Sequence, residues 1–186
     1  MEIVQNVFQA SVIAAGAREL ERKPVPPQEL FRAAISPLRD LAASRDVRIQ
    51  VLIPSGLETL TWEPESTEAA SRAAIKTGIE FSHGGEVKLE VRRVMQNGDP
   101  WLQLRVSDSG SGIPQEDLGH VFDAFWQGDD SGAGKRHGIG LGLTIAKRVV
   151  ENHGGSIVID GGANGGTEVL MSLPQETTGT QDGAPA

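Results

Sequence analysis

The chain has 186 residues, no cysteine and a formal net charge of −8, a length that predicts one domain with a proper core. The lack of cysteine excludes disulfides and thiolate metal sites, and the acidic balance argues against a nucleic-acid-binding surface, which requires a basic face. No apolar run approaches the roughly 20 residues of a membrane span, so we expect no membrane contact by this chain.

Apolar residues at spacings of three and four predict a first helix from Ile3 to Glu21. Such a stripe packs either into the core of its own domain or against another helix, including that of a second chain. Prolines at 24, 26 and 27 end the helix. We therefore expect an N-terminal helix over 1–23, one globular domain over 24–174, and a disordered tail over 175–186, where Gly, Pro and Thr dominate.

The globular domain opens with a predicted helix over 27–46, whose interior Pro37 should bend it. Alternating apolar residues then predict a pair of strands, 47–54 and 57–64, joined by a turn at residues 54–56.

A further helix is predicted from Glu65 to Ser82, with Ser66 as its N-terminal cap. Two more strands, 86–94 and 100–106, flank an Asn97–Gly98 turn of the hairpin type.

The second strand of this hairpin leads directly into an isolated acid, Asp108, which is followed by two closely spaced glycines, Gly110 and Gly112. A second glycine set (138, 140 and 142) opens into a helix predicted from Leu141 to His153. Glycine lets backbone N–H groups approach a ligand, and the start of a helix attracts phosphate. Turn glycines are the alternative, but the fixed order of an acid and two glycine sets favours a ligand site.

Between the glycine sets, the pattern predicts a short helix over 114–125 that turns Phe122 and Phe125 inward. The segment 127–137 carries no helix or strand signal and is expected to be a mobile lid. Its two cations, Lys135 and Arg136, would either contact phosphate or remain solvated surface charges. A final hairpin is predicted over 156–174.

These motifs resemble, in residues and in order, the ATP-binding catalytic domain of sensor histidine kinases, within the superfamily that includes gyrase B, MutL and the heat-shock-90 chaperones. DSGSGIP (108–114), FDAFWQ (122–127) and GIGLGL (138–143) resemble the G1, F and G2 boxes of that family. The resemblance and the element order imply an α/β two-layer sandwich of the Bergerat type, with a mixed, mainly antiparallel sheet and helices on one face.

The resemblance also implies that ATP or ADP is bound, with Asp108 accepting a hydrogen bond from the adenine amino group. The implied nucleotide-binding residues are Asp108, Gly110, Gly112, Ile113, Phe122, Phe125, Lys135, Arg136, Gly138, Gly140, Leu141, Gly142, Leu143 and Thr167. No residue is assigned a catalytic role.

The chain departs from the family in the helix predicted over 65–82, where relatives carry an N box whose asparagines hold Mg²⁺. Aligning the end of that box places Thr77 and Ala73 at the two asparagines, and Glu80 where a lysine is common. Thr77 is then the one candidate metal ligand, and a neutral hydroxyl is a poorer Mg²⁺ ligand than an amide oxygen. The alternatives are an alignment displaced by one turn and a helix with a structural role only.

Three functions fit this pattern. The first is the catalytic domain of a two-component sensor histidine kinase, which passes the γ-phosphoryl group of ATP to a histidine outside this chain. Its implied partners are the dimerisation and phosphoacceptor domain of a parent kinase, a response regulator and a second copy through the N-terminal helix. We expect it in the cytoplasm, either alone or as part of a membrane-anchored sensor. The alternatives are a degenerate nucleotide-binding or interaction module and a serine kinase of the anti-sigma type.

Overall fold

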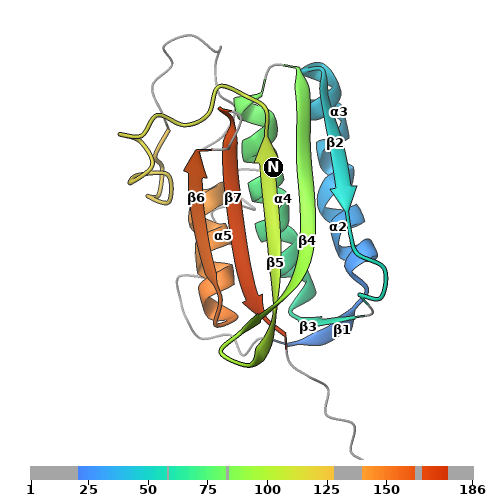
Figure 1. Ribbon diagram of the computed structural model, residues 1–186. Coiled ribbons are helices and arrows are strands. Elements are labelled where there is room, and N and C mark those ends of the chain that lie inside the picture. The colour runs from blue at the N-terminus through green and yellow to red at the C-terminus, as the bar shows by residue number, and fades with distance from the viewer. Residues whose placement is uncertain (1–20, 58, 83, 128–139, 162–164, 176–186) are drawn as a thin grey trace, which may run out of the picture.

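The structure is a computed structural model that describes residues 21–57, 59–82, 84–127, 140–161 and 165–175. Its main feature is a five-stranded sheet in the order β2-β4-β5-β7-β6 (Figure 1). β2 and β4 pair in parallel, whereas all the other neighbours are antiparallel. This confirms the predicted mixed, mainly antiparallel sheet. The strands are β2 (Val47–Leu52), β4 (Gly85–Gln96), β5 (Asp99–Asp108), β6 (Ser156–Gly161) and β7 (Thr167–Pro174).

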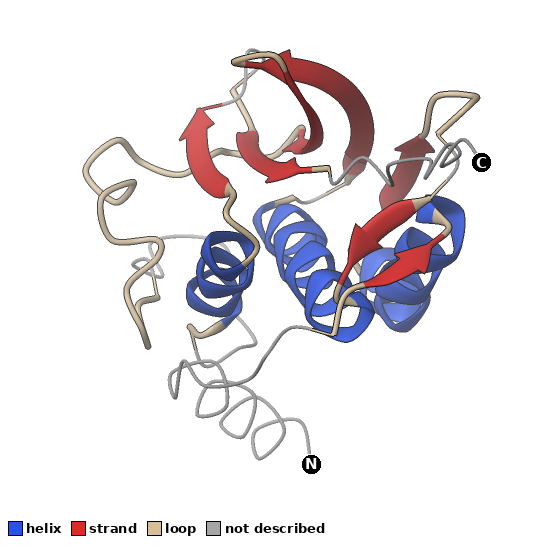
Figure 2. Ribbon diagram, turned by 90° about the horizontal axis from the view of Figure 1, so that it is seen from below, coloured by secondary structure: helices blue, strands red, loops and turns tan. Residues whose placement is uncertain are grey.

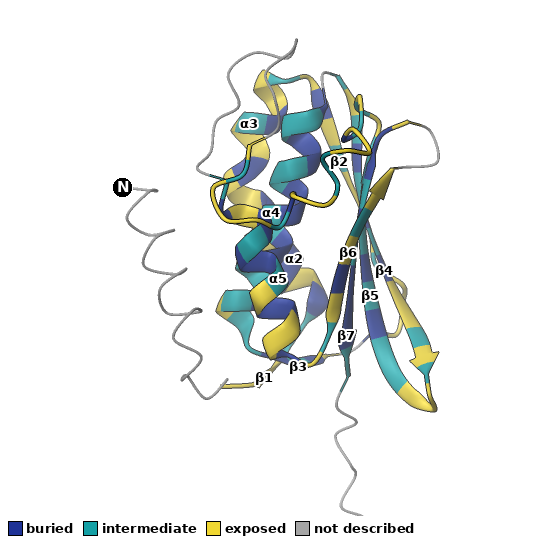
Figure 3. Ribbon diagram, turned by 90° about the vertical axis from the view of Figure 1, so that its left-hand side faces the viewer, coloured by how far each residue is buried: buried dark blue, intermediate teal, exposed yellow. Residues whose placement is uncertain are grey.

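The helices all cover one face of this sheet, which gives the predicted two-layer sandwich (Figure 3). The long helix α4 packs against both α2 and α5, so it forms the middle of the helical layer (Figure 2). The helical elements are α2 (Pro27–Ile35), the 3₁₀ turn η1 (Ser36–Leu38), α3 (Arg39–Ser44), α4 (Pro64–Phe81) and α5 (Gly142–Asn152).

The core lies between the two layers and follows from the period-two alternation of the strands. In the central parts of β4, β5 and β7, every second residue is buried under the helices. The buried set includes Val87, Leu89, Val91, Leu102, Leu104, Val106, Val169, Met171 and Leu173. The β4–β5 connection is the predicted tight turn, because Asn97 and Gly98 both have positive φ, at 54° and 93°.

The predicted strand pair over 47–54 and 57–64 is wrong. β2 pairs with β4, whereas β3 (Leu60–Trp62) pairs antiparallel with β1 (Lys23–Val25), a strand in the segment whose prolines were expected to end the first helix. Burial explains the difference, since Leu60 and Trp62 are only 0% and 1% exposed and the Trp62 Nε1–H donates to the Pro174 carbonyl oxygen at the end of β7, at 3.3 Å. Pro24 is compatible with β1 because this two-stranded ribbon consists only of edges.

Helix boundaries differ from prediction at prolines. The helix expected over 27–46 is interrupted by the 3₁₀ turn η1 around Pro37, between α2 and α3, where a bend was predicted. α4 begins at Pro64, and its cap is Glu63, whose carboxylate accepts a hydrogen bond from the Ser66 N–H at 2.7 Å. Ser66 is therefore not the predicted cap but a capped residue, because proline suits the first position of a helix.

A buried histidine joins the C-terminal end of α5 to the start of α4. His153 is 2% exposed, its Nε2 accepts a hydrogen bond from the Glu63 N–H at 3.2 Å, and its Nδ1 lies 2.8 Å from the Val149 carbonyl oxygen. These partners require a neutral ring that carries its proton on Nδ1. Burial accordingly lowers the pKa of His153.

The predicted N-terminal helix over 3–21 lies almost entirely outside the described residues, as does the predicted tail from 176 onward. Among the helices that the structure describes, none combines the length and apolar character needed to cross a bilayer.

Candidate functional site

Asp108 ends the central strand β5, and its surroundings set its charge. The carboxylate Oδ1 accepts a hydrogen bond from the Gly110 N–H at 2.8 Å. Burial raises the pKa of Asp108, while the N–H groups of Gly110 and Thr167 and the Thr167 hydroxyl partly offset that rise. A half-buried acid with a perturbed pKa, placed at the end of a strand, is a strong candidate for ligand recognition.

Four glycines bring the backbone close around Asp108. Gly78 lets α4 pack onto β5, because a Cβ there would lie 3.5 Å from the Asp108 Cβ. A Cβ at Gly110 would overlap the Phe81 carbonyl oxygen, and one at Gly166 would overlap the Asp108 carbonyl oxygen. Gly112 has a φ of 76°, and its Cβ would lie 2.6 Å from the Gly165 carbonyl oxygen. The loop after β5, the end of α4 and the start of β7 therefore form one tight frame.

Thr167 adds a buried hydroxyl to this frame. The residue is 1% exposed at the start of β7, and its Oγ1 has no hydrogen-bond partner of ordinary geometry among the described residues, although its proximity lowers the pKa of Asp108. An unpaired buried hydroxyl is costly unless a ligand or solvent group satisfies it. Asp108 and Thr167 together thus offer a polar ligand one acceptor and one donor–acceptor group.

The second glycine set lies at the start of α5. Gly140 has a φ of 69°, and its carbonyl oxygen accepts a hydrogen bond from the Phe125 N–H at 2.9 Å. Thr144 on α5 donates to the Phe122 carbonyl oxygen at 3.0 Å. The first turn of α5 contains no acid and has no side-chain cap. Its N–H groups therefore remain available for an anion, as predicted from the glycine pattern.

The predicted helix over 114–125 is wrong. This segment is a series of turns held by hydrogen bonds between residues three apart, such as Asp117 N–H to the Pro114 carbonyl and His120 N–H to the Asp117 carbonyl, both 2.9 Å. Phe125 does not pack inward but is 67% exposed, with a φ of 65°. The Phe125 N–H donates to the Gly140 carbonyl oxygen, and this hydrogen bond requires the positive φ of Phe125, which a helix would not provide.

The aromatic segment nevertheless joins the site through Phe122. Phe122 packs on a small apolar cluster that includes Ile113, Val121 and Leu143. The ammonium of Lys147, on α5, lies 5.3 Å from the centre of its ring. Lys147 and the packing glycines Gly78 and Gly166 were not predicted. A glycine inside an otherwise helical pattern was the available signal for Gly78.

The α4 positions at which Mg²⁺ ligands were expected offer few groups to a metal. The Thr77 hydroxyl donates to the Ala73 carbonyl oxygen at 3.0 Å, so only the lone pairs of a neutral oxygen remain for a metal there. The Ala73 Cβ faces Gly142. The Glu80 carboxylate lies 3.7 Å from the Lys76 ammonium, one turn back on the same helix. Nowhere in the described part of the chain do three His, Cys, Asp or Glu side chains gather as metal ligands would.

Three predicted nucleotide-binding residues, Lys135, Arg136 and Gly138, lie outside the described residues, as does most of the predicted lid. The structure brings the other predicted residues to one end of the domain, near the C-terminal end of β5 (Figure 1). They come from the loop after β5, the turns that follow it, the start of α5 and the start of β7.

The combination of this sheet, these helices and these glycine loops defines a class of nucleotide-binding ATPase domains. Residues 68–177 match the family described as histidine kinase-, DNA gyrase B- and HSP90-like ATPase, and the chain belongs to that family.

Sensor kinases are among its relatives. The chain is 28% identical over 176 residues to hybrid signal transduction histidine kinase D of Dictyostelium discoideum, which covers 94% of this chain and 11% of that protein. It is 26% identical over 180 residues to the circadian input-output histidine kinase CikA of Synechococcus elongatus, covering 95% of this chain and 23% of that protein. The chain thus spans less than a quarter of either relative.

A solved structure supports the fold. Full-length ShkA in complex with AMPPNP superposes with a TM-score of 0.79 at 24% identity, over 95% of this chain and 36% of that one. At this identity the likeness concerns the fold alone, and it agrees with the two-layer arrangement described above.

Proposed function

We propose that this chain is the ATP-binding catalytic domain of a two-component sensor histidine kinase. The observation that carries the proposal is the Asp108 carboxylate, half-buried beside the buried Thr167 hydroxyl and framed by glycines that let the surrounding backbone approach closely. A carboxylate in that position accepts a hydrogen bond from the exocyclic amino group of adenine. The phosphates of ATP or ADP would then lie at the uncapped start of α5, where N–H groups and the helix dipole favour anions.

The reaction that fits this site is phosphoryl transfer. The bond between the γ-phosphorus and the bridging oxygen to the β-phosphate breaks, a new bond forms to an imidazole nitrogen of a histidine on the phosphoacceptor domain of a parent kinase, and ADP remains. This chemistry depends on positioning and charge stabilisation more than on a protein nucleophile. A response regulator would then receive the phosphoryl group. Such a domain requires cellular ATP, so we place it in the cytoplasm.

Asp108→Asn tests the adenine contact. The substitution keeps the size of the side chain but removes the charge-assisted acceptor, which should cost about 1.5–3 kcal/mol of ATP binding. Asp99→Asn, an exposed acid at the β4–β5 turn, is the matched control and should bind like the parent. Calorimetric titration with ATP provides the measurement. Equal affinity of Asp108→Asn and the parent would remove Asp108 from the site and contradict the proposal.

A second candidate function is nucleotide binding without efficient phosphoryl transfer, and one observation favours it: the α4 face that carries Ala73 and Thr77 has no amide side chain to hold a metal. Adenine recognition does not need the ion. We therefore expect the ATP affinity of the parent in excess Mg²⁺ and in EDTA to differ by less than about threefold. This is well under the tenfold change that corresponds to about 1.4 kcal/mol.

Thr77→Asn should increase the dependence on Mg²⁺, because an amide oxygen is a better Mg²⁺ ligand than a hydroxyl already donating along its helix. Thr61→Asn, on β3 at the opposite end of the domain (Figure 1), should leave it unchanged. If the parent already requires Mg²⁺ as strongly as Thr77→Asn does, another residue holds the metal and the kinase function is favoured over the second candidate.

A further inference from the structure

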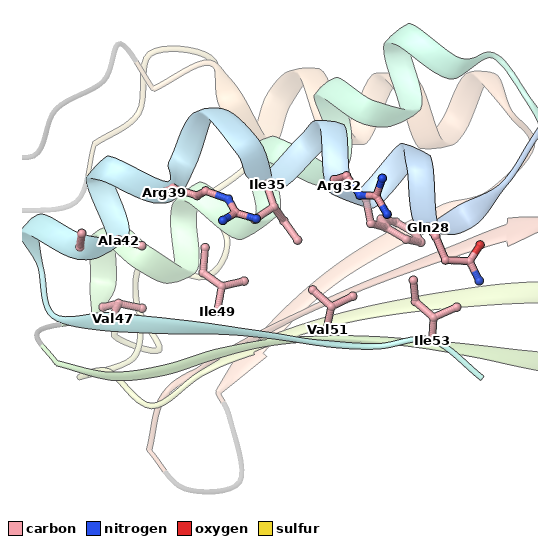
Figure 4. A pocket seen from close by; sticks show the side chains of 11 residues that line it. Gln28, Arg32, Ile35, Arg39, Ala42, Val47, Ile49, Val51 and Ile53 are labelled. Carbon is pink, nitrogen blue, oxygen red and sulfur yellow. The ribbon is translucent and has the colours of Figure 1, made fainter. Parts of the chain in front are cut away.

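A groove of about 500 Å³ lies at the other edge of the sheet and shares no residue with the nucleotide site. It runs between α2 and β2, and Figure 4 shows the β2 side chains pointing across it toward the helix. Its floor and wall are apolar, formed by Phe31, Ile35, Val47, Ile49, Val51 and Ile53. The groove opens toward the end of β2, where Val51 is 37% exposed. A wall of this kind takes apolar side chains from a partner.

The strand beside this groove has a free edge. β2 is the outermost strand of the sheet, and no described strand pairs with its outer side. Its run Val47–Leu52 contains no proline, and Leu52 on its other face is 38% exposed. An edge with unpaired N–H and C=O groups is a template for a further strand. In such an addition, main-chain hydrogen bonds supply affinity and pockets for alternate side chains supply specificity.

The charge of the groove differs from that of the chain. The chain carries a net charge of −8, yet the groove is lined by Arg32 and Arg39 and by no acid. Neither guanidinium has an ion-pair or side-chain hydrogen-bond partner among the described residues. The nearby acids of these helices, Glu29 and Asp40, do not line it. The electrostatic complement of the groove is therefore an acidic segment.

We propose that the free edge of β2 binds an extended acidic segment of a partner protein, which adds a strand to the sheet and places alternating apolar and acidic side chains in the groove. A second copy of this chain does not fit, because pairing β2 with itself would bring Arg32 and Arg39 against the same residues of the other copy. Like charges placed opposite each other in this way are destabilising.

The spacing of the two arginines suggests a probe. Arg32 and Arg39 are seven residues apart and so lie about 10 Å apart along the helix axis. Two residues four apart in an added strand lie about 13 Å apart, a comparable distance. We therefore choose a fluorescein-labelled peptide whose inward-facing positions read Val, Glu, Val, Glu, Val, with threonine at each position between. A peptide with lysine in place of glutamate controls for charge. A peptide N-methylated at every second residue controls for main-chain pairing.

Fluorescence anisotropy with the full chain should show binding of the glutamate peptide and at least tenfold weaker binding of both control peptides. Arg32→Glu combined with Arg39→Glu should weaken the glutamate peptide roughly tenfold or more and restore binding of the lysine peptide. The matched pair Arg93→Glu and Arg148→Glu, exposed arginines outside the groove, should have no effect. Val51→Lys should abolish binding while ATP binding of every variant stays unchanged.

Four results would overturn the proposal: no binding of the glutamate peptide, equal binding by the Arg32/Arg39 double variant, equal binding of the N-methylated peptide, or a parent dimer that Val51→Lys dissociates. The third result would indicate a helix lying in the groove, and the fourth would indicate pairing between two copies. Because ATP binding is measured on the same samples, a failure of this proposal can be distinguished from a failure of the nucleotide site.

Discussion

Two glycines of one motif, Gly140 and Gly142, should respond in opposite ways to the same substitution. At Gly140 the backbone has a φ of 69°, which costs an alanine about 1–2 kcal/mol. The new Cβ would also lie 2.7 Å from the Phe125 carbonyl carbon and overlap the Trp126 carbonyl oxygen. Moving that backbone should cost a further 1–3 kcal/mol or so. Gly140→Ala should therefore lower the free energy of unfolding by about 2–5 kcal/mol.

Gly142→Ala meets no such obstacle. The nearest atom to its new Cβ is the Ala73 Cβ at 3.5 Å, an ordinary contact, and Gly142 opens a helix. Alanine is preferred over glycine in helices, so we expect stability to be unchanged or to rise by at most about 1 kcal/mol. If phosphate approaches the bare backbone here, the same methyl group should weaken ATP binding at least tenfold, or about 1.4 kcal/mol.

Urea unfolding followed by circular dichroism measures the first effect, and calorimetric titration with ATP measures the second. The two variants serve as controls for each other, since each adds one methyl group to the same loop. Unchanged stability of Gly140→Ala would refute the steric argument. A stable Gly142→Ala protein that binds ATP like the parent would show that the start of α5 does not contact the phosphates.

Two further predictions concern pH. Burial raises the pKa of Asp108 above its ordinary value of 3.8, so the charged carboxylate destabilises the folded state. Asp108→Asn should therefore raise the free energy of unfolding at pH 7. This gain should disappear below pH 3.8, where the acid is neutral in both the folded and the unfolded state. Burial lowers the pKa of His153 below 6.5, so its stabilisation is present above 6.5 and is lost as the pH falls below that value. His153→Leu should flatten this part of the stability curve in urea titrations, and it should cost about 1–3 kcal/mol at pH 8 by leaving the Glu63 N–H unpaired. A parent curve that is flat from pH 8 to 5 would contradict the neutral histidine.

The sheet could be predicted because its strands alternate. Residues 87–91 and 102–106 bury every second side chain, and Asn97–Gly98 has few alternatives to a tight turn. The position of Asp108 at the end of β5 follows from the same pattern. These signals are local, so a single sequence contains them.

The errors concern contacts between distant segments. Nothing near Leu60 indicates that it pairs with Val25 rather than with β2, because the choice depends on burial across the whole domain. Likewise, residues 114–125 have helix-like apolar spacing, but the hydrogen bond from Phe125 to Gly140 holds the segment in turns. Gly166 was missed because its reason, the Asp108 carbonyl lying against it, exists only in the folded chain.

The close approach of α5 to α4 restricts which side chains residue 73 can carry. The Ala73 Cβ would be only 3.5 Å from a methyl group at Gly142, so the gap between the helices has room for about one methyl group. An asparagine at 73 would bring three more heavy atoms into that gap, and the helices would have to separate. Both residues 73 and 77 are partly buried, but only Ala73 lies within 4 Å of a Cβ at Gly142. An asparagine at 77 would therefore disturb the contact between the two helices less than an asparagine at 73.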